Sequence, residues 1–94
     1  MKTLYVTAYR YREDLGADDL RELTKLFTEV GAAPSVIAHY SRLDGQGGFV
    51  VQEAADDAAP DYEFTLRYAP WINFEVFPVG TIEEAFPVIQ RVYG

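Results

Sequence analysis

The single histidine of the chain is the side chain best suited to acid–base chemistry. His39 lies in a segment of alternating character and Ser41 follows two residues later, so the two side chains share one face of a strand. An imidazole is suited to general base catalysis at neutral pH. We therefore take His39 as a candidate catalytic base, with a hydrogen-bonded interface histidine as the alternative. A Ser-His-Asp triad is not indicated, because no nucleophile-elbow motif surrounds Ser41.

Glu75 is the second candidate for proton transfer. It lies in the alternating segment 72–79, on the face predicted to carry Asn73 and Phe77. A carboxyl group that points into an interior is suited to move a proton, whereas one that pairs across a subunit interface is structural. If the protein is an enzyme, we expect His39 and Glu75 to be its catalytic residues.

A row of tyrosines shares the face predicted for these two residues. Tyr5, Tyr9 and Tyr11 alternate along one strand. Their hydroxyls are suited to hydrogen bonds with a phenol or carbonyl of a ligand, and such rows also serve as plain packing. The complete predicted ligand-binding set is Tyr5, Tyr9, Tyr11, Ser41, Asn73 and Phe77.

Composition argues against several other kinds of chemistry. The chain has no cysteine and one histidine, so it cannot form a disulfide, a cysteine-based zinc or iron–sulfur site, or a multi-histidine metal site. We expect neither a metal nor a cofactor. Eight Lys and Arg residues stand against fifteen Asp and Glu residues, a net charge of −7. An acidic surface repels phosphate and anionic lipid, so no nucleic-acid or membrane partner is expected.

The length of 94 residues predicts a single domain over 1–94. A domain of this size buries roughly 60–65% of its unfolded surface and gains stability from a partner. No apolar stretch approaches the ~18 residues of a membrane span, and the first residues lack the apolar segment of a secretion signal. We therefore expect a soluble, cytoplasmic protein.

Periodicity predicts the elements that position the candidate residues. Residues 2–11 alternate as a strand does. A helix over about 19–30 follows, with Asp19 as its N-cap and Glu22 as the capping-box partner. Residues 35–53 are predicted to form a β-hairpin around a glycine-rich turn.

A second helix and a fourth strand complete the pattern. The helix is expected within 54–69, with Pro60 in its first turn, and the strand over 72–79. The order β-α-β-β-α-β is typical of an α+β, ferredoxin-like domain. This fold predicts a four-stranded antiparallel sheet in the order 4-1-3-2, with two helices on one face.

A short C-terminal helix is expected after the last strand. Thr81 and Glu84 have the spacing of a capping box. Pro87 lies too deep for a regular helix, so we expect a kink or two short turns.

Strand parity predicts two unlike faces of the sheet. The face toward the helices is expected to carry the aliphatic set Leu4, Val6, Ala8, Val36, Ala38, Phe74 and Val76. For the third strand, either Phe49 and Val51 or Val50 and Gln52 face the helices. The opposite face, with the tyrosines and the histidine, is too aromatic for open surface and too polar for a dry core. We expect a second copy to cover it, either as a plain interface or as one that encloses a ligand cavity.

Several segments resemble a known superfamily. They are 53–59, the aromatic residues Phe64 and Tyr68, and 74–79 followed by 80–81. With the element order, they resemble the dimeric α+β barrel superfamily, and within it a branch of small bacterial proteins known only as a domain of unknown function. The resemblance implies a homodimer whose sheets pack face to face. It implies no single activity, because the superfamily includes cofactor-free oxygenases, polyketide cyclases, isomerases and haem-handling enzymes.

Three functions follow as hypotheses. The first is a homodimer that binds a small organic molecule in a cavity between the sheets. The second is a cofactor-independent enzyme, similar to a monooxygenase, cyclase or isomerase, acting on an aromatic or polyketide-type substrate. In it, His39, Glu75 and a tyrosine would transfer protons. The third is a non-catalytic oligomerisation or interaction module.

Overall fold

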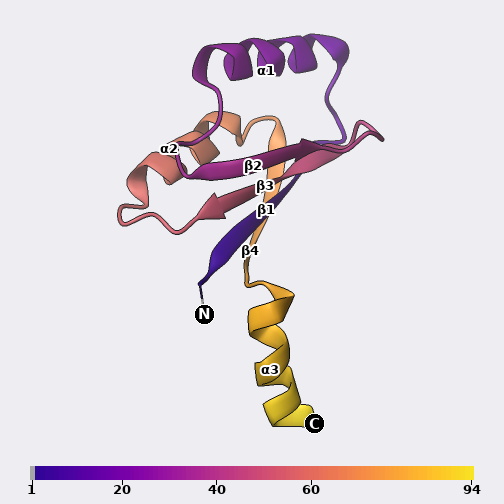
Figure 1. Ribbon diagram of the computed structural model, residues 1–94. Helices are drawn as coiled ribbons and strands as arrows, with labels where there is room; N and C mark the ends of the chain where they lie inside the picture. The colour runs from indigo at the N-terminus through magenta and orange to yellow at the C-terminus, as the bar shows by residue number, and fades with distance from the viewer. Residues whose placement is uncertain (1) are drawn as a thin grey trace.

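The computed structural model, which describes residues 2–94, has the element order β-α-β-β-α-β followed by a third helix (Figure 1). This order confirms the ferredoxin-like prediction. The elements are β1 (Leu4–Tyr11), α1 (Ala17–Val30), β2 (Val36–Ser41), β3 (Gly47–Glu53), α2 (Ala59–Tyr68), β4 (Ile72–Val79) and α3 (Ile82–Tyr93). Within the described range, no helix has both the length and the apolar character needed to cross a membrane.

The four strands form one antiparallel sheet in the order β2-β3-β1-β4, as predicted. Tyr9 stands in the middle of it, paired with Gly48 on one side and Phe74 on the other. A side chain at Gly48 would collide with the Tyr9 ring and with the Tyr40 carbonyl. The glycine-rich end of β3 therefore provides the space in which the Tyr9 ring lies.

Helix α1 begins two residues earlier than predicted. Its N-cap is Gly16, and the Asp19 carboxylate accepts a hydrogen bond of 2.9 Å from the Gly16 N–H. The prediction of Asp19 as N-cap was therefore wrong, because this carboxylate caps backward from the first turn. The helix ends as expected, with Gly31 at φ 73° as its C-cap.

Helix α2 is shorter than its predicted range. Residues 54–58 stay outside it, and Asp57 accepts a hydrogen bond of 3.0 Å from the Ala59 N–H at the helix start. Pro60 lies in the first turn, as predicted. There its missing N–H breaks no helical hydrogen bond.

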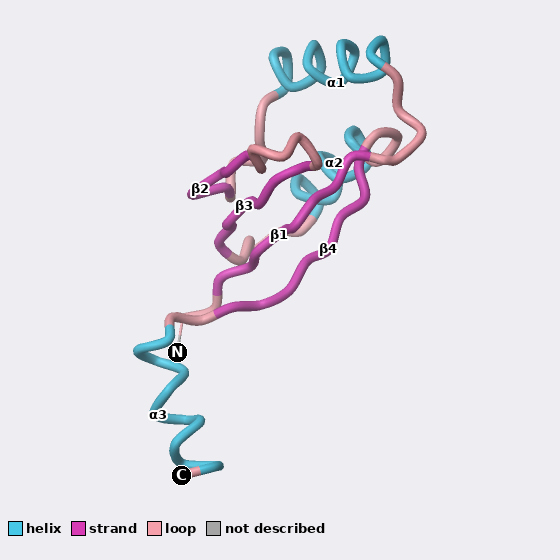
Figure 2. The backbone as a smooth tube through the Cα atoms, turned by 90° about the vertical axis from the view of Figure 1, so that its right-hand side faces the viewer, coloured by secondary structure: helices cyan, strands magenta, loops and turns pink. Residues whose placement is uncertain are grey.

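Helix α3 begins at the predicted cap. The Thr81 hydroxyl accepts a hydrogen bond of 3.3 Å from the Glu84 N–H. Pro87 lies inside one continuous helix, so the expected break into two short turns does not occur. Pro87 has no N–H to donate to the carbonyl of Glu83, and Glu83 is an exposed residue. The helix extends away from the sheet beyond the end of β4 (Figure 2).

The face assignment of the sheet was wrong. Helices α1 and α2 lie over the side that carries the tyrosines and the histidine, where Leu20 and Leu23 of α1 line the same cavity as Tyr5, Tyr9 and His39. Leu4, Val6, Ala8 and Ala38, which were predicted to face the helices, lie on the side that no helix of residues 2–94 covers (Figure 2). Val36 lines the cavity on the helix side, because the pairing of β2 with β3 shifts between Val36 and Ala38. Alternation shows which side chains share a face, but not which of two apolar faces a helix covers. Tyrosine rings bury apolar area against a helix while their hydroxyls keep polar partners.

Strand register also decides which residues of β3 and β4 face the helices. Val50 and Gln52 of β3 lie on the helix-covered face, where they line the cavity. Phe74 and Val76 of β4 line it too, as predicted for the helix side. Glu75 pairs with Ala8 and therefore lies on the opposite face.

Candidate ligand-binding site

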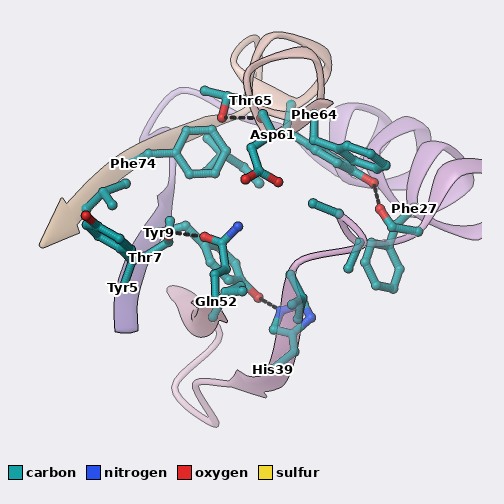
Figure 3. Close-up of a pocket in the computed structure, with 18 of the residues that line it drawn as sticks. Tyr5, Thr7, Tyr9, Phe27, His39, Gln52, Asp61, Phe64, Thr65 and Phe74 are labelled. Atoms are coloured by element: carbon teal, nitrogen blue, oxygen red, sulfur yellow. Dashed lines mark hydrogen bonds between the residues drawn. The ribbon is translucent and has the colours of Figure 1, made fainter. Parts of the chain in front are cut away.

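A cavity of about 960 Å³ lies between the sheet and helices α1 and α2 (Figure 3). Its size is within the range of small-molecule sites. Aromatic side chains from both helices and from strands β1 and β4 contribute to the walls: Tyr5, Tyr9, Tyr11, Phe27, Tyr62, Phe64, Tyr68 and Phe74. A cavity of this composition is suited to an apolar, ring-containing molecule.

Tyr9 and His39 form the first polar group of the cavity. The Tyr9 Oη and His39 Nε2 atoms are 2.6 Å apart, and the rings meet edge to face at 5.6 Å. The Phe27 ring of α1 packs edge-on against the same imidazole at 5.9 Å. Tyr9 is only 9% exposed, whereas His39 is exposed at the cavity surface.

The environment of Tyr9 favours its protonated form. Burial raises the pKa of the Tyr9 hydroxyl, and the neighbouring Tyr11 raises it further. At neutral pH the hydroxyl therefore keeps its proton. It donates this proton to Nε2 when the His39 imidazole carries its own N–H on Nδ1.

A second polar group crosses the sheet as a chain of hydrogen bonds. The Thr7 hydroxyl donates to Gln52 Oε1 at 2.7 Å, and Gln52 Nε2 donates to Ser35 Oγ at 3.2 Å. The Ser35 hydroxyl donates to Asp61 Oδ1 at 2.8 Å. The chain links β1 and β3 to the first turn of α2. In Figure 3 the Asp61 carboxylate points into the cavity.

The charges around the cavity are negative. Its lining contains two carboxylates, Glu53 and Asp61, and no Lys or Arg. Glu53 is paired with Lys2 at 3.3 Å. No ion pair within residues 2–94 involves Asp61. The same part of the chain holds no group of three or more His, Asp or Glu side chains placed to bind a metal ion.

The structure brings together part of the predicted site. Tyr5, Tyr9, Tyr11, Ser41 and His39 all line the cavity. The three predicted members from β4, which are Asn73, Glu75 and Phe77, lie on the other face of the sheet. This placement follows from the pairing of Tyr9 with Phe74. The expected proton-transfer pair of His39 and Glu75 is therefore not formed within the chain.

Sequence reasoning missed the contribution of α2. The signal was present: Asp61, Phe64, Thr65 and Tyr68 have the spacing of one helical face, and all four line the cavity. Asp61 was not among the predicted site residues. A carboxylate on the same stripe as two aromatic residues is directed toward the interior.

Comparison with known proteins gives one match. A model of the family described as "Domain of unknown function (DUF3303)" matches residues 3–93. The chain belongs to this family. Neither the curated proteins nor the solved structures contain a match to this DUF3303 chain. The family assignment confirms the expected kind of family and carries no residue roles, so function has to be argued from the cavity itself.

Proposed function

We propose that this DUF3303 chain binds a small, largely aromatic organic molecule in the cavity between its sheet and helices α1 and α2. The supporting observation is that aromatic walls and the hydrogen-bonded pair of Tyr9 and His39 converge on one space of about 960 Å³. This proposal moves the expected cavity from between two sheets to the interior of one subunit. It keeps the expected class of ligand.

The Tyr9 and His39 pair is the polar anchor of the proposed site. A phenol or carbonyl of the ligand would hydrogen-bond to the exposed imidazole, while Tyr9 holds the ring in place from the buried side. The same pair is suited to proton transfer, so a cofactor-independent reaction on the ligand is the second candidate function. In that reaction Glu75 takes no part, because it lies on the opposite face.

A neutral fluorescent dye tests the proposal. Binding of 1-N-phenylnaphthylamine, whose emission rises in apolar surroundings, is expected to saturate with the wild-type chain. Thr65→Trp should abolish this signal, because Thr65 lines the cavity from α2. Leu66→Trp is the matched control, since Leu66 is exposed on the same helix outside the cavity lining. No saturable binding, or equal loss in both variants, contradicts the proposal.

We also propose that the chain forms a homodimer through the uncovered face of the sheet. By strand register, this outer face carries two sets of residues. The apolar set is Leu4, Val6, Ala8, Ala38, Tyr40, Phe49, Val51, Phe77 and Val79, and the polar set is Arg10, Glu53, Asn73 and Glu75. No helix covers it, and Tyr40 is 65% and Phe49 42% exposed. An exposed group of large apolar side chains with polar residues among them is typical of a protein interface.

The dimensions of the single chain support this second proposal. Its accessible surface is 6965 Å², whereas a monomer of 10.6 kDa is expected to expose about 5,500 Å². The excess is larger than the roughly 800 Å² that each partner contributes to a standard interface. The radius of gyration of 15.9 Å likewise exceeds the roughly 12 Å of a compact chain of this length.

Helix α3 adds apolar surface that the single chain leaves open. Ile82, Phe86, Ile89 and Tyr93 follow one another at helical spacing and all are exposed. The helix projects beyond the sheet (Figure 1), so a second copy supplies the cover that its own subunit does not.

Sedimentation equilibrium at micromolar concentration tests the homodimer. The wild-type chain is expected to be a dimer and Phe49→Glu a monomer, because a buried charge at the interface is costly. Leu43→Glu, at a fully exposed residue in the turn after β2, is expected to remain dimeric. A monomeric wild-type chain would overturn this second proposal.

A further inference from the structure

We infer that the ligand of this cavity is an arylalkylamine, a ring-containing molecule with an aliphatic amine, whose protonated ammonium group pairs with Asp61. The inference rests on the proposed function and adds the charge of the ligand to it. Its basis is a half-buried carboxylate that points into an aromatic cavity and has no cationic partner within residues 2–94.

The first argument is the charge balance of the lining. The other carboxylate that lines the cavity within residues 2–94, Glu53, already has Lys2 at 3.3 Å. No Lys or Arg lines the cavity to receive an anionic ligand. An acid would therefore bring a second negative charge next to Asp61, whereas an ammonium compound would neutralise it.

The second argument is desolvation. Ser35 donates to one oxygen of the Asp61 carboxylate, and Asp61 is only partly buried, so the rest of the carboxylate is accessible to water when the cavity holds no ligand. A ligand that fills the cavity removes this water, and an ionised carboxylate without a new partner is then costly. An ammonium group replaces the lost water with a charge-assisted hydrogen bond. A neutral ring of the same shape cannot form such a hydrogen bond with the carboxylate.

The third argument is the aromatic surroundings of Asp61. Phe64 lies three residues after Asp61 on α2, which places the two side chains as neighbours on the helix surface. Both line the cavity. A cation held at the carboxylate thus lies close to aromatic rings, which attract organic ammonium groups.

The two polar groups of the cavity also define a length. Ser35, which donates a hydrogen bond to Asp61, directly precedes β2, and His39, which is hydrogen-bonded to Tyr9, lies four residues later within it. The rise of a strand makes this separation on the order of 10 Å. We therefore expect an ammonium group at one end of the ligand and a hydroxyl or carbonyl at the other, with a ring between them.

Three probes with one skeleton test the inference by isothermal titration calorimetry. They are tyramine (a cation), 4-ethylphenol (neutral) and 3-(4-hydroxyphenyl)propionate (an anion). Tyramine is expected to bind roughly ten- to hundredfold more tightly than 4-ethylphenol, as a charge-assisted hydrogen bond provides. The anion is expected to bind most weakly.

Two isosteric variants identify the carboxylate responsible. Asp61→Asn keeps an acceptor for the Ser35 hydroxyl and should remove the preference for tyramine. Asp57→Asn carries the same charge change at the start of the same helix, outside the cavity lining, and should retain the preference. Thermal unfolding of both variants shows that each is folded.

The outcomes separate this inference from the proposed function. Equal affinity for tyramine and 4-ethylphenol, or an unchanged preference in Asp61→Asn, overturns the ligand charge and leaves the cavity proposal standing. Saturable binding of the dye without binding of tyramine likewise overturns the ligand charge and leaves the cavity proposal standing. Failure of the dye and of all three probes overturns the proposed function as well.

Discussion

The two faces of the sheet are both rich in apolar side chains, yet the chain treats them differently. The covered face combines rings with hydroxyl, imidazole and amide groups that are hydrogen-bonded to one another, as in the pair of Tyr9 and His39. The outer face is mainly aliphatic and aromatic, with Glu75 and Asn73 of β4 among its polar residues, and no helix of residues 2–94 lies over it. The comparison teaches that rings with hydrogen-bonded polar groups identify the face that the helices cover, whereas mainly apolar character without such pairs is found on the uncovered face.

The largest loss of stability is expected from a substitution where the helix-covered face of the sheet meets α1. Leu23 is 8% exposed and packs with Tyr9 and Ile72 in the buried cluster. Leu23→Ala should lower the free energy of unfolding by about 2–4 kcal/mol, as buried leucine truncations do. Leu20 is 39% exposed on the same helix, so Leu20→Ala should lower the free energy of unfolding by less than half of the loss in Leu23→Ala. Urea denaturation measures both. Equal losses would mean that α1 does not pack on this face.

The next effect compares one tyrosine from each face. Tyr9→Phe removes the hydrogen bond to His39 and should lower the free energy of unfolding by about 1 kcal/mol. Tyr40→Phe, on the outer face, removes an exposed hydroxyl and should change it by less than about 0.5 kcal/mol. Urea denaturation again provides the values. A larger loss at Tyr40 would reverse the roles assigned to the two faces.

Ligand affinity should separate the two originally predicted catalytic residues. His39→Ala is expected to weaken 1-N-phenylnaphthylamine binding about threefold or more, because His39 lines the cavity and packs on Phe27. Glu75→Gln should leave the dissociation constant unchanged, since Glu75 lies opposite Ala8 on the other face. Fluorescence titration distinguishes these results. A loss of affinity on Glu75→Gln would show that the outer face also contacts ligand.

The smallest effect is the pH dependence of stability at alkaline pH. Burial raises the pKa of Tyr9 and, separately, of Tyr68 above the ordinary 10.0. The folded chain therefore holds these protons more tightly than the unfolded chain. Their contribution is complete below about pH 10 and is lost as pH rises through the raised values. Urea denaturation between pH 8 and 11 should show a decline that is shallower in Tyr9→Phe. An identical slope in the variant would contradict this assignment.

Much of the fold follows from local signals. The four strands, the ends of α1 at Gly31 and of α3 at Thr81, and the first-turn position of Pro60 were predicted from periodicity and capping. Asp19 was misplaced by three residues from the true N-cap because a carboxylate in the first turn satisfies the same backbone groups as one at the cap. Such errors are confined to element boundaries.

The candidate site was only partly predictable. Alternation correctly grouped Tyr5, Tyr9 and Tyr11, and the same rule grouped His39 with Ser41. It also grouped Glu75 with Asn73. Whether these two residues share a face of the sheet with the tyrosines depends on strand register, which no local pattern encodes. The pairing of Tyr9 with Phe74 decides it. Asp61 was missed for a similar reason, because its role depends on which face of α2 meets the sheet.

The amino-acid sequence by itself determined the elements, their order, the topology of the sheet and which side chains share each strand face. These properties depend on backbone propensity, on a period of two or 3.6 residues and on a small set of allowed connections. Only the tertiary structure decided which face the helices cover and which distant residues meet. The two faces have similar apolar content, so local patterns do not distinguish them. The difference in free energy between covering one face and covering the other comes from contacts between segments far apart in the chain, such as Tyr9 with Leu23 and Asp61 with Ser35.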